Sequence, residues 1–490
     1  MHVQPGRPEE ILARRKSTDA GASIGLQGKR LYFAVAAISL GTMLTIIDGA
    51  IATVALPTIA HDLRVDNSSA VMVVTVYQLV LVMALLPFSA LGDRIGLKRL
   101  YQGGQLVFTI ATILCFFAHS LGFLLVVRAL QAVGAAAALS VMAAMIRRVY
   151  PAQHLGRGLG LNNIMGSVSG ALAPTAGGLI LAIAPWPWVF AAAAPFAVLS
   201  LALGRWALPD VPPRPGSYNL AGAMLNMATF GLFISGLEAL VHGNSPVVSG
   251  AVVAIGLLFG VVLVLHERKE PVPILPVDLL ARPVLSLSVA GAFVAFLASQ
   301  LITLSLPFRL QHAYGFLPSE VGAMIAPWPL TTMIVAPVAG TLSDRYPAGL
   351  LGGIGMTVAT VAAGLLAFLP AHPQYFDVAW RMALCGAGFG LFLSPNARLI
   401  VGSAPRDRAA SAGGLVSTTR LVGQTMGATG VATMLALGFG KTPGPAFVAG
   451  CLTIVAGLLS VSRLRPSMRN PTAHETSVAQ PGSHGDVGAA

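Results

Sequence analysis

The chain has 490 residues, of which 55% are apolar and 10% are charged. A soluble domain carries roughly a quarter charged residues, and a water-soluble chain of this composition would expose too much apolar surface to stay dispersed. Composition therefore excludes a soluble protein and indicates a membrane protein with several spans.

Apolar segments long enough to cross a bilayer recur along the whole chain. The first follows a polar, basic stretch and is longer than the core of a signal peptide, so we interpret it as a retained helix. Because the segments lack the alternation of barrel strands, helices are the expected spanning element. Fourteen spans are predicted, at residues 31–57, 70–91, 101–119, 121–146, 159–184, 188–208, 219–241, 247–265, 284–308, 318–342, 349–369, 377–402, 409–436 and 444–463.

The 30 lysines and arginines support this layout, which places most of them on one side of the membrane. The exceptions are Arg64, Arg309 and Lys441, on the other side, and Arg128, Arg381, Arg398 and Arg420, within spans. Because basic loops stay in the cytoplasm, both termini are predicted to be cytoplasmic. The net charge of +12 then reflects topology and contact with anionic lipid, and no nucleic-acid partner is needed.

Two polar loops divide the chain into parts. A proline-rich loop from Pro209 to Gly216 and a charged loop from His266 to Pro271 flank two spans, and removing these two leaves six spans on either side. Duplicated halves are a common plan of transporters. We expect an all-α membrane protein with a cytoplasmic N-terminal tail (1–30), a six-helix bundle (31–208), a linker with two extra spans (209–283), a second six-helix bundle (284–463) and a disordered cytoplasmic tail (464–490).

A short loop packed with charge joins the second and third spans. An acidic residue and glycines inside a basic cluster indicate helix ends held together by charge pairing at close backbone approach. The run from Leu91 to Arg94 recurs as Leu342 to Arg345 at the equivalent place in the second half. The residues assigned to this cytoplasmic gating loop and its repeat are Asp93, Arg94, Gly96, Lys98, Asp344 and Arg345.

Asp48 is the foremost candidate for a functional residue. At 1.5 Å per residue it lies about 26 Å along the helix from Arg30 and about 14 Å from Pro57, and a carboxylate at that depth is costly unless it is paired, hydrated or protonated. Arg128 enters from the opposite side to a similar depth, so the two side chains are expected to share a cavity and form a proton-sensitive pair. The alternatives are a structural aspartate and an arginine that snorkels to the interface.

Other polar residues within spans are weaker candidates. Arg420 lies too deep to snorkel easily, and either faces the cavity or bonds to a neighbouring helix end. Pro174, Gly177 and Gly178 would give a helix a place to bend and to be approached closely, or else serve ordinary packing. The pocket candidates, which would equally serve as helix–helix hydrogen bonds, are Tyr77, Gln78, Gln131 and Asn163.

Four motifs in chain order resemble the major facilitator superfamily, specifically its fourteen-helix drug:proton antiporters (the EmrB/QacA-like branch). The loop motif G-x-L-A-D-R-x-G-R-K is matched by Leu91, Asp93, Arg94, Gly96 and Lys98, with Ser89 and Leu97 as departures. The first-span motif is matched by Asp48, Ile51, Val54, Ala55, Leu56 and Pro57, and the fourth-span motif R-x-x-Q-G-x-G-A by Arg128, Gln131, Gly134 and Ala135. The antiporter motif G-P-x-x-G-G appears as Ala173 to Gly178, followed by an aromatic string from Trp186 to Phe190.

The resemblance implies the major facilitator fold and a proton-coupled antiporter that exports drugs and other amphipathic small molecules by alternating access. It implies a location in the bacterial cytoplasmic (inner) membrane. The expected partners are a small-molecule substrate, protons and the lipid bilayer; the sequence neither identifies nor excludes a periplasmic adaptor. No enzymatic activity, cofactor or metal is expected, since the histidines show no paired metal spacing. A dedicated metabolite exporter or importer and a non-transporting membrane sensor remain as alternatives.

Overall fold

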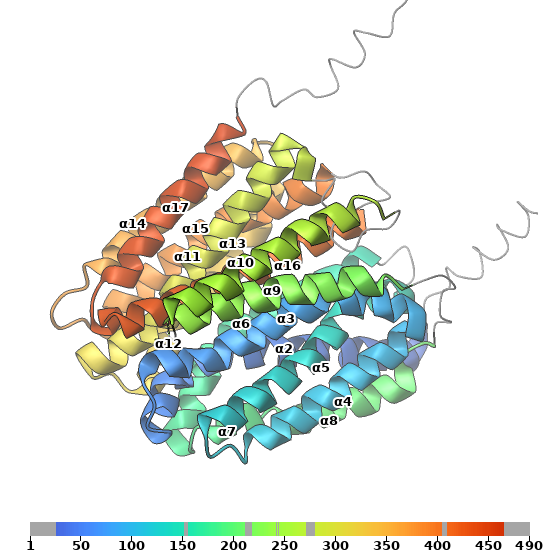
Figure 1. Ribbon diagram of the computed structural model, residues 1–490, viewed down its shortest axis with the longest axis horizontal. Helices are drawn as coiled ribbons and strands as arrows, with labels where there is room; N and C mark the ends of the chain where they lie inside the picture. Colours follow the sequence, from blue (N-terminus) through green and yellow to red (C-terminus); the bar gives the residue numbers. More distant parts are fainter. Residues whose placement is uncertain are drawn as a thin grey trace, which may run out of the picture.

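The computed structural model describes residues 26–150, 155–210, 218–241, 243, 245–270, 280–403 and 409–464. Within those ranges the regular secondary structure is entirely helical (Figure 1). The long helices are α2 (Gly28–Asp62), α3 (Asn67–Ile95), α4 (Leu97–Cys115), α5 (Leu121–Val149), α6 (Leu155–Ile183), α8 (Ala194–Ala207), α9 (Leu220–Val241), α10 (Pro246–Glu267), α11 (Pro283–Tyr314), α13 (Pro327–Leu342), α14 (Ala348–Ala367), α15 (Tyr375–Gly402), α16 (Ala409–Ala436) and α17 (Gly444–Ser462). Three short elements, α7 (Pro187–Ala191), α12 (Pro318–Ile325) and the 3-10 turn η4 (Phe439–Lys441), complete the described part.

Eleven described helices are long and apolar enough to cross a membrane. In this count α7 with α8 and α12 with α13 each make one span, while α4, α6 and α16 run beside the others without being included. An all-helical, multi-span membrane fold is therefore confirmed. The exact number of fourteen spans stays a prediction.

The predicted spans overlap the observed helices, and the differences have local causes. The sixth and tenth spans are each broken into a short and a long helix where a proline occupies the first turn of α8 and α13. The ninth span was predicted over residues 284–308, with Arg309 beyond it. Helix α11 continues past that point to Tyr314 and ends at Gly315, whose φ of 75° is the left-handed conformation that commonly terminates a helix.

Helices α2–α8, here called the N-group, and α11–α17, the C-group, show the same packing pattern. In the N-group α2 packs on α6 and α8, α4 packs on α5 and α8, and α3 packs on α5. In the C-group α11 packs on α16 and α17, α14 packs on α15 and α17, and α13 packs on α15. Each long N-group helix thus has a counterpart in the C-group with corresponding neighbours.

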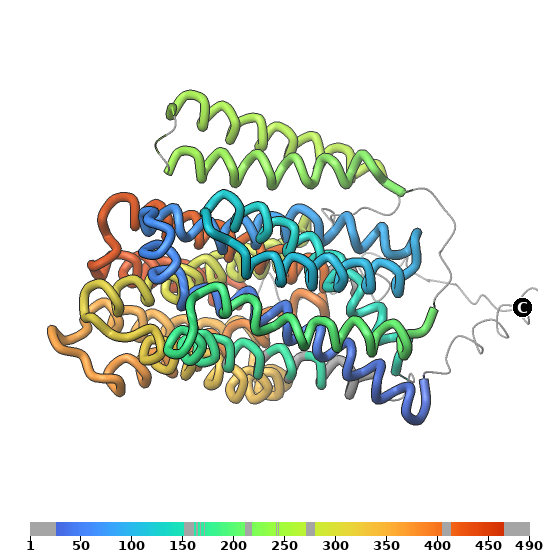
Figure 2. Tube along the Cα trace, turned by 90° about the horizontal axis from the view of Figure 1, so that it is seen from below, coloured from blue at the N-terminus to red at the C-terminus, as the bar shows by residue number. Residues whose placement is uncertain are grey.

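The two groups meet mainly along three contacts, and an extra helix pair lies outside them. Across the groups α3 packs on α16, α6 packs on α12 and α13, and α2 packs on α11. Helices α9 and α10 form a hairpin at the periphery of the bundle (Figure 2), with α9 contacting α3 and α16. The hairpin therefore covers the seam between α3 and α16 from the periphery.

The groups are closed against each other at one end of the bundle. We call the end at which α2 begins the basic end, which is predicted to be cytoplasmic, and the opposite end the far end. In the far-end half a continuous core includes residues from both groups, among them Ile51 and Ala55 of α2, Leu304 of α11, and Ala428 and Val431 of α16, each no more than 4% exposed. This core joins the two groups in the far-end half of the bundle.

Candidate functional site

The predicted pair of Asp48 and Arg128 is a direct ion pair deep in the N-group. The Nη1 atom of Arg128, from α5, lies 2.7 Å from Oδ2 of Asp48, from α2. Both side chains are buried, with exposed fractions of 0% and 1%. Such an arrangement pairs each charge with its opposite, which is the condition under which charges are tolerated at membrane depth.

Gln131 connects the pair to a third helix. One turn along α5 from Arg128, it donates from Nε2 to Oδ1 of Asp48 at 2.8 Å and to Oγ1 of Thr112 on α4 at 3.0 Å. Its Oε1 accepts a hydrogen bond of 2.5 Å from Nη1 of Arg128. Both carboxylate oxygens of Asp48 are therefore held, one by the guanidinium and one by the amide.

The cluster is enclosed by packed side chains, whereas the sequence led us to expect that the two side chains share a cavity. The guanidinium of Arg128 lies 4.2 Å from the ring centroid of Tyr77 and 5.1 Å from that of Phe190, and Nε donates to the Val73 carbonyl. The rings remove the ion pair from water, and cation–π attraction adds to the ion pair in holding the guanidinium. The Nη2 atom of Arg128 and the hydroxyl of Tyr77 have no hydrogen-bond partner among the described residues.

Sequence reasoning found four members of this cluster and missed others. Asp48, Arg128, Tyr77 and Gln131 were all candidates, and the structure brings them together. Thr112 and Phe190 were not singled out. Phe190 lies in the aromatic string recognised after the antiporter motif, which was the available signal, whereas nothing in the pattern around Thr112 distinguishes it from other threonines within spans.

The antiporter motif lies at the contact between α6 and α12. A side chain at Gly178 would meet the Pro318 carbonyl and the Ser319 backbone at 2.8 Å, and one at Gly322 would collide with the Pro174 carbonyl. Gly177 faces α2, where a Cβ would lie 2.8 Å from the side chain of Ile51. The three motif residues thus permit the close approach that closes the far end.

The loops predicted as gates lie at the basic end. Gly96 joins α3 to α4 with a φ of 97°, a conformation that favours glycine, and Lys98 pairs with the exposed Asp210 at 3.4 Å. Asp93 and Arg94 end α3. In the repeat, Asp344 pairs with Arg398 of α15, whose Nη1 also donates to the Gly340 carbonyl at 3.1 Å, while Arg345 lies exposed in the same turn.

Three remaining candidates lie outside the cluster. Gln78 is buried on α3, and its Oε1 has no hydrogen-bond partner among the described residues. The side chain of Asn163 lies outside the described part of the chain. Arg420 is exposed in the middle of α16 and forms no ion pair or hydrogen bond with any described residue.

A second buried carboxylate joins the peripheral hairpin to the C-group. Glu238, near the far end of α9, is 7% exposed and accepts a hydrogen bond of 2.6 Å from Thr429 of α16. This buried hydrogen bond links α9 of the hairpin to α16.

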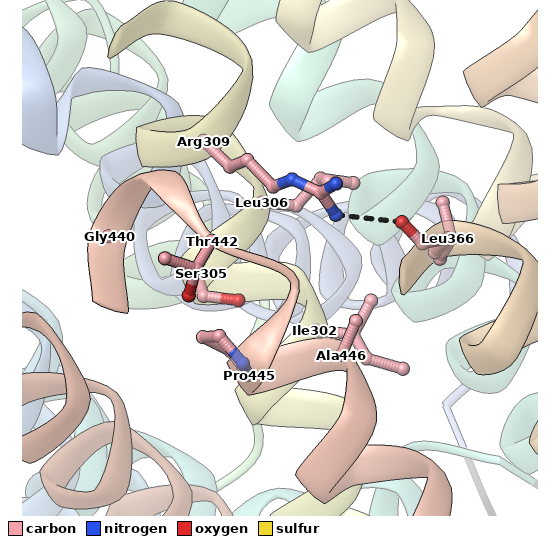
Figure 3. A pocket seen from close by; sticks show the side chains of 9 residues that line it. All are labelled: Ile302, Ser305, Leu306, Arg309, Leu366, Gly440, Thr442, Pro445 and Ala446. Carbon is pink, nitrogen blue, oxygen red and sulfur yellow. Dashed lines mark hydrogen bonds between the residues drawn. The ribbon is translucent and has the colours of Figure 1, made fainter. Parts of the chain in front are cut away.

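A small cavity at the far end of the C-group is too confined for a substrate. Its volume is about 10 Å³, room for a single water. Figure 3 shows Arg309 reaching over it, and its Nη1 and Nη2 donate to the carbonyls of Leu366 and Ala367, the last residues of α14. Arg309 therefore provides hydrogen bonds to carbonyl groups at the C-terminal end of α14, which have no partner within that helix.

Comparison with known proteins decides the family. Residues 38–428 and 288–483 match the sequence family described as the Major Facilitator Superfamily. The chain belongs to that superfamily. It is 41% identical over 445 residues, 90% of this chain and 97% of the relative, to the uncharacterized transporter YebQ of Escherichia coli K12.

Other relatives of this major facilitator protein have more specific names. It is 26% identical over 401 residues to the riboflavin transporter RibZ of Clostridioides difficile, covering 81% of this chain and 87% of the relative. It is 27% identical over 414 residues to the multidrug resistance protein Stp of Mycobacterium tuberculosis, covering 84% of this chain and 76% of the relative.

Solved structures agree on the fold. A crystal structure of a bacterial homologue of the lysosomal transporter Spinster, titled as inward-facing and unoccupied, superposes with a TM-score of 0.65 at 18% identity, covering 89% of this chain and 97% of that one. A peptide transporter of the POT family in complex with sulfate gives a TM-score of 0.69 at 16% identity, with coverages of 92% and 98%. The major facilitator protein described here is thus a multi-pass membrane transporter, and no enzymatic role is indicated.

Proposed function

We propose that this transporter is a proton-coupled antiporter that exports amphipathic small molecules across the bacterial cytoplasmic membrane. The observation that carries the proposal is the buried cluster of Asp48, Arg128 and Gln131. It is a buried titratable pair, and replacing a buried ion pair by apolar side chains is often neutral for stability, so its presence at this depth supports a functional role.

The coupling follows from the position of Asp48 on α2. Protonation of its carboxylate would remove the attraction for Arg128 and loosen the link between α2 and α5. About one turn farther along α2, Ile51 packs on Gly177 of α6. Nearly two turns from Asp48, the Val54 carbonyl accepts a hydrogen bond of 3.3 Å from Gln311 of α11. A shift of α2 therefore acts directly on the contacts that hold the far end closed.

A proton gradient supplies enough energy for uphill export. One charge moved through 100 mV is worth about 2.3 kcal/mol. Names such as multidrug resistance protein among the relatives support the export of toxic compounds. The name of a riboflavin transporter among them keeps a dedicated metabolite transporter as the second candidate.

The test is dye transport into inside-out vesicles with an imposed proton gradient. In vesicles that contain the natural chain, acidifying the lumen should drive accumulation of ethidium or of an anionic dye. We expect Asp48→Asn to abolish the dependence on the gradient, because a neutral amide cannot take up and release the proton, whereas Asp48→Glu should retain part of it.

Asp62→Asn provides the matched control, since the same chemical change is made at an exposed site at the end of α2. Undiminished gradient-driven transport by Asp48→Asn at normal expression would refute the proposed proton coupling. Transport of a single metabolite, with none of the dyes, would favour the second candidate.

A further inference from the structure

One face of α16 carries polar side chains that neither group covers. Ser417, Arg420 and Gln424 follow one another at intervals of three and four residues, so they share one face of the helix. Arg420 is exposed, and the other two are half-buried. We call these three residues the α16 stripe.

The neighbours of α16 fix the direction in which the stripe points. Thr429, which bonds Glu238 of the peripheral hairpin, lies nine residues from Arg420, or about two and a half turns, and therefore on the opposite side of the helix. Gly423 and Gly427 mark the side that packs on α11. Gly414, closest to Leu86 of α3, marks the side toward α3.

Arg420 consequently points into the sector between α3 and α11, away from the periphery. Helix α2 lies across that sector, since it packs on both α3 and α11. The stripe thus faces the inside of the molecule, between the two groups, although Arg420 is exposed.

Burial changes along this face of α16. Toward the far end the face continues with Ala428 and Val431, both 0% exposed in the core shared by the two groups. Toward the basic end it continues with Ser417 and Gly413, which are half-buried. Packing therefore closes the face on the far-end side of Arg420 and is looser on its basic-end side.

Arg420 has no counter-charge in the described part of the chain. Asp48 is held by Arg128 and Gln131, and Glu238 lies at the opposite face of α16. Arg381 and Arg398, near span ends, pair with Asp377 and Asp344. Arg309 and Arg463 instead donate to backbone carbonyls and neutral side chains, so these guanidinium groups also have partners within the chain. An unpaired guanidinium at membrane depth is costly, and its retention here calls for a partner that comes from outside the chain.

We propose that Arg420 binds an anionic group of the transported molecule, so that the cargo class is amphipathic organic anions with a carboxylate, sulfonate or phosphate group. This inference rests on the proposed transport function and names its substrate. A guanidinium presents a planar fork of donors that matches an oxyanion with two parallel hydrogen bonds. Ser417 and Gln424, one turn on either side, add neutral polar groups for the rest of the molecule.

The test uses two probes with one ring system, the anion 1-anilinonaphthalene-8-sulfonate and the neutral N-phenyl-1-naphthylamine. Binding to the purified full chain is measured by stabilisation against heat, and transport by accumulation in acid-loaded inside-out vesicles. A panel of carboxylate dyes and their esters extends the comparison to further matched pairs.

We expect Arg420→Gln to weaken binding of the anionic probes by roughly 10- to 100-fold, as for loss of a charge-assisted hydrogen bond. The neutral partners should keep their affinity, and Arg420→Lys should restore part of the anion binding. Lys441→Gln is the matched control, because it removes one positive charge at an exposed position.

The outcomes separate this inference from the proposed transport function. If neutral or cationic probes accumulate in response to the proton gradient and no anionic probe binds or accumulates, the proposed anion recognition is wrong and the proposed transport function is supported. Anion binding that depends on Arg420 without gradient-driven flux would support recognition and overturn proton coupling. If no probe of any charge binds or moves, both proposals fail.

Discussion

At the scale of single residues, the buried pair of Asp48 and Arg128 governs both stability and proposed coupling. Removing one partner of a buried ion pair leaves the other charge uncompensated and costs about 3–5 kcal/mol. We therefore expect Arg128→Gln to lower the melting temperature of the detergent-solubilised protein substantially. Asp48→Asn should do the same, because it strands a guanidinium that is 0% exposed.

The double variant Asp48→Asn/Arg128→Gln distinguishes charge from packing. It removes both charges while keeping side chains that can hydrogen bond, so we expect it to be more stable than either single variant. It should still lack gradient-driven transport. Additive losses of stability in the double variant would contradict the ion pair as the source of the effect.

Asp66 provides a pH-dependent test outside the membrane-spanning segments. Its carboxylate caps α3 by accepting from the backbone amide of Ser69 at 3.0 Å and from the hydroxyls of Ser68 and Ser69. Partial burial raises the pKa of Asp66, but these hydrogen bonds outweigh it and lower the pKa to about 2. A depressed pKa means that the cap stabilises fully above the ordinary value of about 3.9 and is lost as the pH falls through about 2.

We expect Asp66→Ala to cost about 1 kcal/mol at neutral pH, in line with the loss of a helix cap. The difference in melting temperature between Asp66→Ala and the natural chain should shrink as the pH is lowered from 4 toward 2. Thermal unfolding at these pH values, with Asp62→Asn as an exposed control, measures the effect. A difference that grows in acid would contradict the lowered pKa.

At the scale of helices, the contact between α6 and α12 decides whether the far end is closed. Both sides use glycine, Gly178 on α6 and Gly322 on α12, because the backbones approach too closely for a side chain. We expect Gly178→Ala to push the two helices apart. Gly364→Ala on α14 is the matched control, since nothing lies within 4 Å of a Cβ at that position.

The measurement is the reactivity of a cysteine introduced as Thr53→Cys on the far half of α2, in a chain whose three native cysteines are replaced. A membrane-impermeant thiol reagent added on the far side should label this cysteine several-fold faster in the Gly178→Ala background. Equal labelling rates in the Gly178→Ala and Gly364→Ala backgrounds would show that this contact does not hold the far end closed.

At the scale of the whole molecule, the distribution of basic residues predicts the orientation in the membrane. His119 lies exposed between α4 and α5 at the far end, and Tyr346 lies exposed between α13 and α14 at the basic end. In intact cells an impermeant maleimide should label His119→Cys and spare Tyr346→Cys until the membrane is permeabilised. The reverse pattern would invert the proposed direction of export.

Much of the fold could be predicted from the sequence, because the features that indicate membrane helices lie within short stretches of the chain. Apolar length marks the spans, and the depth of Asp48 and Arg128 along their own helices placed both at the same level of the membrane. Proline and glycine signals had local consequences as well, such as the breaks before α8 and α13 and the left-handed link at Gly96.

By itself, then, the sequence showed that the chain is a membrane protein and where its helices lie. It also identified the charged residues whose burial inside the membrane costs free energy. Tertiary structure alone decided that Tyr77 and Phe190 enclose the ion pair, that Glu238 is buried against Thr429, and that Arg420 faces the interior instead of lipid. The physical reason is that burial and direction depend on which neighbouring helices cover each face. That is settled by packing between segments far apart in the chain, and no window of local sequence contains it.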